Sequence, residues 1–241
     1  MFQIELADHN ILIHNHFSYI VDLCKDYLIT ENSHCDLEIE IPLEVIQAEQ
    51  QKSLIDVSLA YCESICVYRE ISLKLLKYQT MIMHSAMISC DGRGYAFCAK
   101  SGTGKSTHIA LWKKVYGSRV KIINGDKPLI RRISTDSSDK TTFIAYGTPW
   151  CGKENWGTRD QVSLNAICFI ERGTTNSIRR MTDTEIIQKL FHQLLIPEKE
   201  NLLNIEMDMA DSLIKEIPFY VLTCNMSEEA AITAYNELSK I

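Results

Sequence analysis

The chain has 241 residues, which fits one large α/β domain or one domain with a small appendage. Hydrophobic residues make up 46% of it and charged residues 23%, ordinary values for a globular protein. Its formal net charge of -6 argues against a nucleic-acid-binding protein, which usually carries a basic face. We therefore expect no nucleic-acid partner.

The sequence also argues against a membrane or secreted protein. No apolar run approaches the roughly 20 residues that a membrane-spanning helix needs, and the start at Met1 lacks the basic and apolar stretches of a signal peptide. The nine cysteines are odd in number and follow no disulfide framework, which predicts reduced thiols in a cytoplasmic protein. Cys62 and Cys66 lie four residues apart, but no second pair has this spacing, so we predict core packing rather than a metal site.

Residues 1–79 are interpreted as a small N-terminal α+β segment packed on the core. Apolar alternation predicts strands at Phe2–Leu6, Ile11–Ile13 and Cys35–Ile41. Helical spacing predicts a helix over Phe17–Ile29 and one or two further helices between residues 42 and 78.

Residues 80–241 are interpreted as one nucleotide-binding domain. Strands are predicted at Met81–Cys90, Tyr95–Cys98, Val120–Ile123, Leu129–Ile133, Thr142–Tyr146, Leu164–Glu171, Ser177–Arg180 and Phe219–Cys224. Helices are predicted over Lys105–Tyr116, from a capping box of Thr182 and Glu185 to about Leu195, within 199–216, and after a cap at Ser227. This order predicts an α/β fold with a mixed sheet.

A glycine-rich segment, Ala99–Thr107, follows a predicted strand and precedes a predicted helix. It matches the phosphate-binding pattern G-x-x-x-x-G-K-[ST], except that Ala99 stands in place of the first glycine. Gly102 and Gly104 allow the backbone to wrap closely with its N–H groups turned inward. The N-terminus of the following helix adds partial positive charge. The sequence therefore predicts a P-loop.

The predicted P-loop assigns ATP and Mg²⁺ as ligands. Lys105 would meet the β- and γ-phosphates, and the hydroxyl of Ser106 would be a Mg²⁺ ligand. The alternative is a glycine-containing turn that binds nothing, and the intact run of residues favours binding. The predicted nucleotide-binding residues are Ser101, Gly102, Thr103, Gly104, Lys105, Ser106 and Thr107.

A P-loop needs a partner carboxylate at the end of a nearby strand. Asp126 lies 20 residues after Ser106 and follows the predicted strand Val120–Ile123, at the edge where ligands of open α/β sheets gather. We predict that it binds the metal and orients or deprotonates the attacking hydroxyl. The alternative is that residues 124–126 only form a tight turn. Asp136 and Asp139 fall in a polar loop and are predicted to be solvated.

Four markers together resemble a known family. They are His84-Ser85-Ala86, the predicted P-loop, Asn124-Gly125-Asp126-Lys127-Pro128, and Gly147-Thr148-Pro149-Trp150-Cys151-Gly152-Lys153. Over roughly residues 80–240 the chain resembles the catalytic domain of HPr serine kinase/phosphorylase. It is more similar to the smaller HPr-kinase-like proteins found beside bacterial peptide-modification genes.

The resemblance implies a fold shared with ATP-dependent phosphoenolpyruvate carboxykinases and transfer of phosphate from ATP to a serine hydroxyl. It also implies that Lys105, Asp126 and His84 are catalytic, with His84 near the transferred phosphate, and it favours a homo-oligomer. HPr kinases carry two adjacent aspartates where this chain has Gly125-Asp126, which leaves a second metal site and the reverse phosphorolysis open. The motif that grips HPr is not found, so the expected acceptor is not HPr itself.

Residues 147–159 form a long predicted loop with three glycines, two tryptophans, a lysine and an arginine. Such loops are commonly functional. We predict substrate-binding roles for Trp150, Gly152, Lys153 and Arg159, with Lys153 or Arg159 stabilising phosphate charge or pairing with an acidic substrate. The alternative is a loop anchored by its own tryptophans. An arginine finger is open among Arg131, Arg132, Arg172, Arg179 and Arg180.

The favoured function is an ATP-dependent kinase that phosphorylates a hydroxyl, either serine of a peptide or protein or a small-molecule alcohol. One alternative is a carboxykinase-type lyase acting on oxaloacetate, which needs additional metal ligands and a much longer chain. Another is a nucleotide-binding scaffold for a peptide partner without catalysis.

Overall fold

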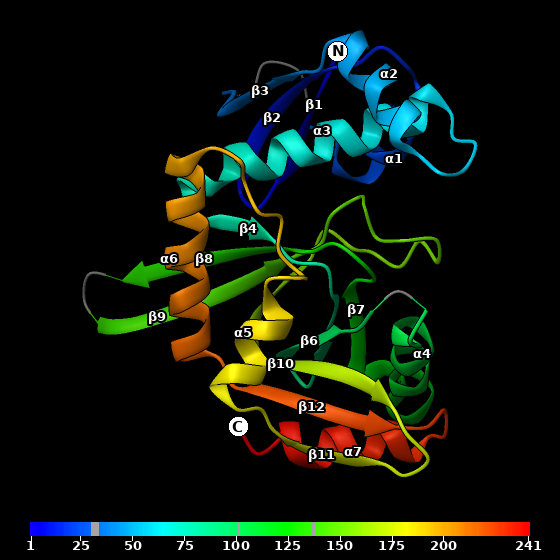
Figure 1. The fold of residues 1–241 in the computed structure, drawn as a ribbon, viewed down its shortest axis with the longest axis vertical. Coiled ribbons are helices and arrows are strands. Elements are labelled where there is room, and N and C mark those ends of the chain that lie inside the picture. The colour runs from blue at the N-terminus through cyan, green and yellow to red at the C-terminus, as the bar shows by residue number, and fades with distance from the viewer. Residues whose placement is uncertain (30–33, 101, 136–137) are drawn as a thin grey trace.

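A computed structural model describes residues 1–29, 34–100, 102–135 and 138–241. Figure 1 shows an elongated molecule with the N-terminal sheet and helices at one end and a larger mixed α/β part at the other. The sheets have three and nine strands.

The N-terminal part is a small sheet covered by helices. Strand β1 (Phe2–Leu6) pairs antiparallel with β2 (His9–His14), and β2 pairs in parallel with β3 (Leu37–Glu40). Alternate residues of β2 are buried, as the period of a half-buried strand requires. The helices are α1 (Tyr19–Leu23), α2 (Leu43–Lys52) and α3 (Leu59–Leu75). Two helices between residues 42 and 78 confirm that prediction.

The predicted helix over Phe17–Ile29 is wrong in length. Helix α1 ends at Leu23, and a single 3₁₀ turn follows over Lys25–Tyr27. The chain leaves the helix because its next residues find partners elsewhere. The Tyr27 hydroxyl donates to the Thr158 carbonyl at 2.8 Å, and Leu28 forms a bridge with Ile4 of β1.

The nine-stranded sheet turns around one long strand, β10 (Gln161–Arg172). The first residues of β10 pair antiparallel with β9, and its later residues lie in parallel between β6 and β12. The other strands are β4 (Thr80–Ile82), β5 (Ala86–Cys90), β6 (Arg93–Cys98), β7 (Val120–Asn124), β8 (Leu129–Thr135), β9 (Ser138–Tyr146), β11 (Ser177–Arg180) and β12 (Phe219–Cys224). This mixed sheet confirms the predicted α/β class.

Helices cover both faces of the part of the sheet around β6. On β6, Tyr95 and Phe97 join the core beneath α4 (Lys105–Tyr116) and α7 (Glu229–Leu238), whereas Ala96 and Cys98 join the core beneath α5 (Asp183–Leu190) and α6 (Glu200–Glu216). Successive side chains of a strand point to opposite faces, so this division follows directly from the two-residue period.

One predicted strand, Met81–Cys90, is in fact two. Strand β4 pairs with β8, whereas β5 pairs with β6 and β7, and the chain between them makes other contacts. The His84 N–H donates to the Gln193 carbonyl at 2.7 Å, and the Ser85 N–H donates to the Asp126 carbonyl at 3.0 Å. His84 therefore lies in the connection between strands and not within one.

Helix boundaries in the C-terminal half differ in detail from the prediction. The capping box of Thr182 and Glu185 is confirmed, but α5 ends at Leu190 and not near Leu195. Ser227 does not cap α7, because its hydroxyl donates to Asn225 Oδ1 at 2.6 Å and the helix begins at Glu229. Strand β8 pairs antiparallel with β9, from Leu129 opposite Tyr146 to Thr135 opposite Ser138. Asp136 and the side chain of Asp139 lie outside the described residues, so their predicted solvation stays a prediction.

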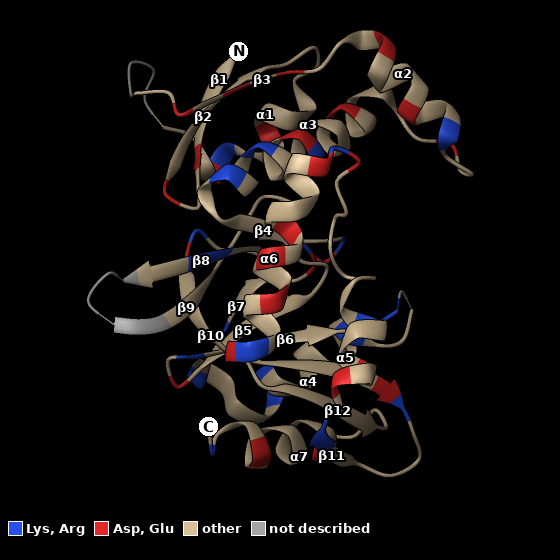
Figure 2. Cartoon of the chain, turned by 60° about the vertical axis from the view of Figure 1, so that its left-hand side comes forward, with Lys and Arg blue, Asp and Glu red and all other residues tan. Residues whose placement is uncertain are grey.

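The N-terminal segment shares its core with the larger part. Leu129, Tyr146 and Trp150 belong to the same buried cluster as the strands β1–β3. All nine cysteines are free thiols, and Cys62 and Cys66 are buried in this cluster, as predicted. In the described ranges, no helix has both the length and the apolar character needed to cross a membrane. Figure 2 shows charged residues on both parts, with several acidic residues along α6.

Candidate active site

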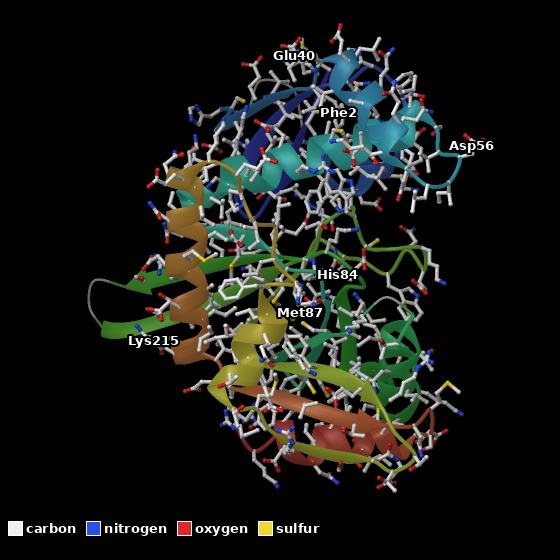
Figure 3. All side chains as sticks on the ribbon, in the orientation of Figure 1. Phe2, Glu40, Asp56, His84, Met87 and Lys215 are labelled. Carbon is white, nitrogen blue, oxygen red and sulfur yellow. The ribbon has the colours of Figure 1, made fainter. Side chains whose placement is uncertain are left out.

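Several strands end at one edge of the large sheet. Strands β6, β10 and β12 run parallel, and β7 runs in the same direction as β6 because both are antiparallel to β5. Their carboxyl ends, at Cys98, Arg172, Cys224 and Asn124, therefore share an edge. His84 reaches the same edge because it precedes the first residue of β5, and Figure 3 shows it between the two parts of the molecule. Ligands of open α/β sheets bind at such an edge.

The glycine-rich segment connects β6 to α4 at this edge. Gly102 has φ of 76° and Gly104 has φ of 117°, in the left-handed region that favours glycine. Gly104 is the residue before helix α4, so Lys105, Ser106 and Thr107 form its first turn. A helix N-terminus presents unpaired N–H groups and partial positive charge, which suits a phosphate. Ser101 lies outside the described residues.

Arg172 contacts the glycine-rich segment from the end of β10. Its Nη2 donates to the Gly102 carbonyl at 2.5 Å and its Nε donates to the Thr103 carbonyl at 3.1 Å. The sequence left five arginines open as candidates for an arginine finger. Of these five, Arg172 is the one that contacts the glycine-rich segment. The others pair elsewhere: Arg131 with Asp8, Arg132 with Asp208, Arg179 with Glu185, and Arg180 over the ring of Tyr220.

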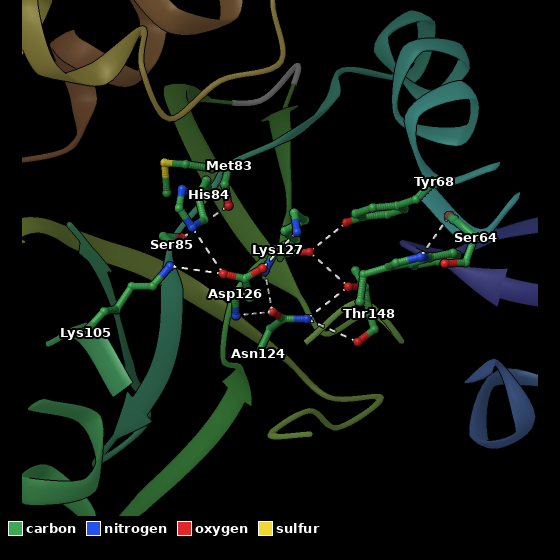
Figure 4. Close-up of polar contacts among 11 residues, drawn as sticks. Ser64, Tyr68, Met83, His84, Ser85, Lys105, Asn124, Asp126, Lys127 and Thr148 are labelled. Atoms are coloured by element: carbon green, nitrogen blue, oxygen red, sulfur yellow. Dashed lines mark hydrogen bonds and ion pairs between the residues drawn. The ribbon is translucent and has the colours of Figure 1, made fainter. Parts of the chain in front are cut away.

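Asp126 lies at the centre of a cluster of basic side chains. Lys105 Nζ lies 3.3 Å and His84 Nε2 lies 3.1 Å from Asp126 Oδ1, and Lys127 Nζ lies 2.9 Å from Oδ2. Figure 4 shows these side chains converging on the carboxylate. Burial alone would raise the pKa of Asp126, but the hydrogen bonds from His84 and Lys127 and the charges of Lys127 and Lys105 more than offset this effect. The pKa of Asp126 lies well below its usual value, so the carboxylate is ionised at neutral pH.

Asn124 holds the turn that carries Asp126. Its Oδ1 accepts from the N–H groups of Asp126 and Lys127 at 2.8 and 2.7 Å, and its Nδ2 donates to the carbonyl and hydroxyl of Thr148 at 3.1 and 2.9 Å. Asn124 is fully buried, so its amide group has to form its hydrogen bonds with these protein partners. The sequence left open that residues 124–126 only form a tight turn, and asparagine before a turn is a known signal for this bonding.

Gly125 permits close approach of the loop over residues 147–160. The Gly125 N–H donates to the Trp156 carbonyl at 2.7 Å. A Cβ added at Gly125 would lie 2.7 Å from the Cys151 carbonyl oxygen, which is too close. A second aspartate beside Asp126 therefore does not fit this backbone.

Trp150 ties the loop to the N-terminal segment. Its ring stacks on Tyr68 of α3 with centroids 4.1 Å apart and an interplanar angle of 7°, and its Nε1 donates to the Ser64 carbonyl at 3.0 Å. The Tyr68 hydroxyl donates to the Lys127 carbonyl at 2.6 Å. Sequence reasoning missed Tyr68, because apolar spacing assigns it to the helix core and contains no signal for its hydroxyl.

A cavity of about 720 Å³ brings most of the predicted site residues together. Those that line it are His84, Gly102, Gly104, Lys105, Ser106, Thr107, Asp126, Trp150, Gly152 and Lys153. Lys153 is 90% exposed and has no carboxylate closer than Glu154, at 4.0 Å, in the described part of the chain. Two residues lie outside this lining. Thr103 faces two neighbouring cavities, and Arg159 pairs with Glu5 at 2.8 Å.

The cavity also brings together two oxygen ligands. The Ser106 hydroxyl and the Asp126 carboxylate both line it, and oxygen donors are the ligands that Mg²⁺ prefers. The residues present therefore fit a Mg²⁺ ion that completes its coordination with phosphate and water. Among the described residues, no group of three or more His, Cys, Asp or Glu side chains is arranged to hold a metal ion by itself.

The comparisons with known proteins give only distant structural likenesses. No protein-family model matches the chain, and no curated protein matches its sequence. The structure is similar to that of the HPr(Ser) kinase/phosphatase from Coxiella burnetii, with a TM-score of 0.36 and 8% sequence identity, over 66% of this chain and 97% of that one. At these values the likeness supports no conclusion about the family, substrate or catalysis of this chain.

Proposed function

We propose that the chain is an ATP-dependent kinase that transfers the γ-phosphate of ATP to a hydroxyl, most simply that of serine in a peptide or protein. The observation that carries this proposal is the shared contact of Lys105 and His84 with one oxygen of Asp126, at the first turn of a helix that follows a glycine-rich segment. Cations, a carboxylate and a helix N-terminus are the groups that phosphoryl transfer requires in one place.

Lys105 would exchange partners when the nucleotide binds. Its ammonium group would leave Asp126 for the β- and γ-phosphate oxygens, whose charge is greater. The carboxylate oxygen that contacts Lys105 would then be open to the acceptor hydroxyl. Nucleotide binding would thus prepare Asp126 to accept a proton.

The transfer itself follows from the same groups. Asp126 would accept the proton of the acceptor hydroxyl while the oxygen of that hydroxyl bonds to the γ-phosphorus. The bond between this phosphorus and the bridging oxygen of the β-phosphate would break, and ADP would leave. His84 and Lys105 would neutralise charge on the transferred group. Mg²⁺, held by Ser106 and Asp126 together with the phosphates, would supply further charge stabilisation when bound.

The proposal is tested with the whole chain, radiolabelled ATP, Mg²⁺ and a library of serine-containing peptides. We expect ATP binding and transfer of label to peptide, and we expect the label to be retained through treatment that hydrolyses acyl phosphates. Lys114→Ala is a matched control, because Lys114 lies on the same helix as Lys105 but is exposed and pairs with Glu228.

Three results would contradict the proposal. Absence of ATP binding would remove its basis. Tight ATP binding without transfer to peptides or small alcohols, and without hydrolysis, would instead favour a nucleotide-dependent scaffold. Decarboxylation of oxaloacetate in the presence of ATP would favour a carboxykinase-type lyase.

A further inference from the structure

The cavity that contains Lys105 and Asp126 has a second wall that the proposed chemistry does not use. Tyr19 and Leu23 of α1 and Tyr61 and Ser64 of α3 line it, and all four belong to the N-terminal segment. If the N-terminal segment had only a structural role, its residues would not need to line the cavity that contains Lys105 and Asp126.

This second wall is apolar and accessible. Tyr19 and Tyr61 are 42% and 45% exposed, and their rings meet edge to face with centroids 6.5 Å apart. In the described part of the chain, neither phenol hydroxyl has a hydrogen-bond partner. Leu23 is half-buried beside them and packs against the N-terminal core. Large aromatic rings left exposed as a pair are typical of a surface that binds an apolar group.

Helix α3 connects the aromatic pair to the turn that carries Asp126. On α3, Tyr61, Ser64 and Tyr68 lie three and four residues apart, which places them along one side of the helix. The Ser64 carbonyl accepts from Trp150, and the Tyr68 hydroxyl donates to the Lys127 carbonyl, next to Asp126. Helix α3 therefore carries Tyr61 and contacts the turn that carries the carboxylate, and Tyr19 of α1 packs edge to face against Tyr61. This arrangement is what a specificity site requires.

We infer that Tyr19 and Tyr61 bind the acceptor, and that the acceptor is a polypeptide with a large apolar or aromatic side chain within a few residues of the phosphorylated hydroxyl. This inference rests on the proposed kinase function. Phosphate binding uses the wall formed by the glycine-rich segment, so the wall formed by the N-terminal segment is left for the other substrate. The hydroxyl of the acceptor must reach Asp126, and the apolar side chain of the acceptor must reach Tyr19 and Tyr61 at the open rim of the cavity.

An extended acceptor explains the openness of this rim better than a small alcohol does. Sites for small ligands bury most of the surface of their ligand. Here Tyr19, Tyr61 and Lys153 remain substantially exposed although they line the cavity. A peptide would enter past these residues and leave the rest of its chain in solvent.

The experiment uses the full chain and peptides that contain one serine, with each position from three before it to three after it varied in turn. The wild-type chain is expected to prefer Phe, Tyr, Trp or Leu over Ala and Asp at one or two positions. The double variant Tyr19→Ala/Tyr61→Ala is expected to lose this preference and about tenfold in kcat/KM for the preferred peptide, the value of one good aromatic contact. Its Kd for ATP is expected to stay unchanged.

Two controls separate apolar recognition from other effects. Tyr19→Phe/Tyr61→Phe keeps the rings and removes the hydroxyls, and it is expected to act like the wild type. Val45→Ala changes a residue of the N-terminal segment that is similarly exposed, at 47%, but does not line the cavity. It is expected to leave both the preference and kcat/KM unchanged.

The outcomes distinguish this inference from the proposed function. Transfer to serine peptides with a flat preference at every position, or with unchanged kcat/KM in the alanine double variant, would overturn the inference and leave the kinase function standing. Transfer to small alcohols but to no peptide would do the same. A wild-type chain that binds no ATP would overturn both.

Discussion

Arg172 holds the Gly102 carbonyl, and through it the conformation of the glycine-rich segment. The two groups lie 2.5 Å apart, and the same guanidinium also binds the Thr103 carbonyl. Across a trans peptide the carbonyl of one residue and the N–H of the next point in opposite directions. The Gly104 N–H therefore points away from Arg172, and Gly104 also lines the cavity that contains Lys105 and Asp126.

We therefore expect Arg172→Ala to weaken binding of a non-hydrolysable ATP analogue by about tenfold, the loss of roughly one charge-assisted hydrogen bond. Arg172→Lys is expected to recover part of this affinity, because an ammonium group can reach one carbonyl but cannot bridge two. Titration calorimetry measures both. Arg179→Ala is the control, since Arg179 pairs with Glu185 on the surface. Unchanged affinity in Arg172→Ala would show that the segment keeps its conformation unaided.

Lys105→Ala and Asp126→Asn are each expected to reduce phosphate transfer by about a hundredfold or more, because each removes a charge that acts in the transition state. Both variants should stay folded, since Asp126 retains His84 and Lys127 when Lys105 is removed, and Asn124 still holds the turn. Initial rates with labelled ATP, together with circular dichroism, test this. Normal turnover in either variant would contradict the role assigned to it.

Gly125→Asp would restore the pair of adjacent aspartates found in HPr kinases, and we expect it to destabilise this chain. The new Cβ would lie 2.7 Å from the Cys151 carbonyl oxygen, and backbone on both sides prevents easy relief. The expected loss is about 1–3 kcal/mol of unfolding free energy, as for other overpacked sites. Gly125→Ala should lose a similar amount, because the clash begins at Cβ. Urea denaturation of both variants measures the loss, and a stable Gly125→Asp protein would show that the loop can move.

Glu206 makes the stability of the fold depend on pH. The side chain is 1% exposed on α6, its Oε1 has no hydrogen-bond partner among the described residues, and burial raises its pKa to about 8. Since the folded pKa lies above the unfolded one, the folded state holds a proton that the unfolded state releases. Stability therefore falls as pH rises from about 4.5 to about 8 and is constant beyond that range.

Glu206→Gln should remove this dependence. At pH 7 the wild type is destabilised by about 3 kcal/mol, because pH 7 lies about 2.5 units above the pKa of this group in the unfolded chain. The melting temperature of the variant should exceed that of the wild type increasingly between pH 5 and pH 8. Glu216→Gln, at the exposed end of the same helix, should show no such trend. Parallel melting curves for Glu206→Gln and wild type across this range would exclude a buried titrating carboxyl.

Local patterns predicted the parts of the site that follow from the chain itself. A glycine-rich segment between a strand and a helix is visible in the sequence because left-handed backbone at Gly102 and Gly104 requires glycine. The position of Asp126 at a strand end follows from apolar periodicity. The capping box at Thr182 is likewise local, since both of its hydrogen bonds join residues three apart.

Long-range contacts could not be predicted in this way. Tyr68 and Lys127 are 59 residues apart, and Arg172 and Gly102 are 70 apart. Nothing in the spacing of either pair indicates a partner. The break in the predicted strand Met81–Cys90 has the same origin. His84 and Ser85 leave the strand for carbonyls of Gln193 and Asp126, which only the folded chain brings near.

The sequence by itself determined the α/β class, the element types, the glycine-rich segment and the aspartate that follows the next strand, because backbone conformation and two-residue or helical periods are local properties. Only the tertiary structure decided which cations surround Asp126, which arginine holds the segment, and that the N-terminal helices form a wall of the same cavity. Those relationships depend on strand order and on packing between distant elements. They are stabilised by the burial of apolar surface contributed by residues from the whole chain, which local sequence patterns do not show.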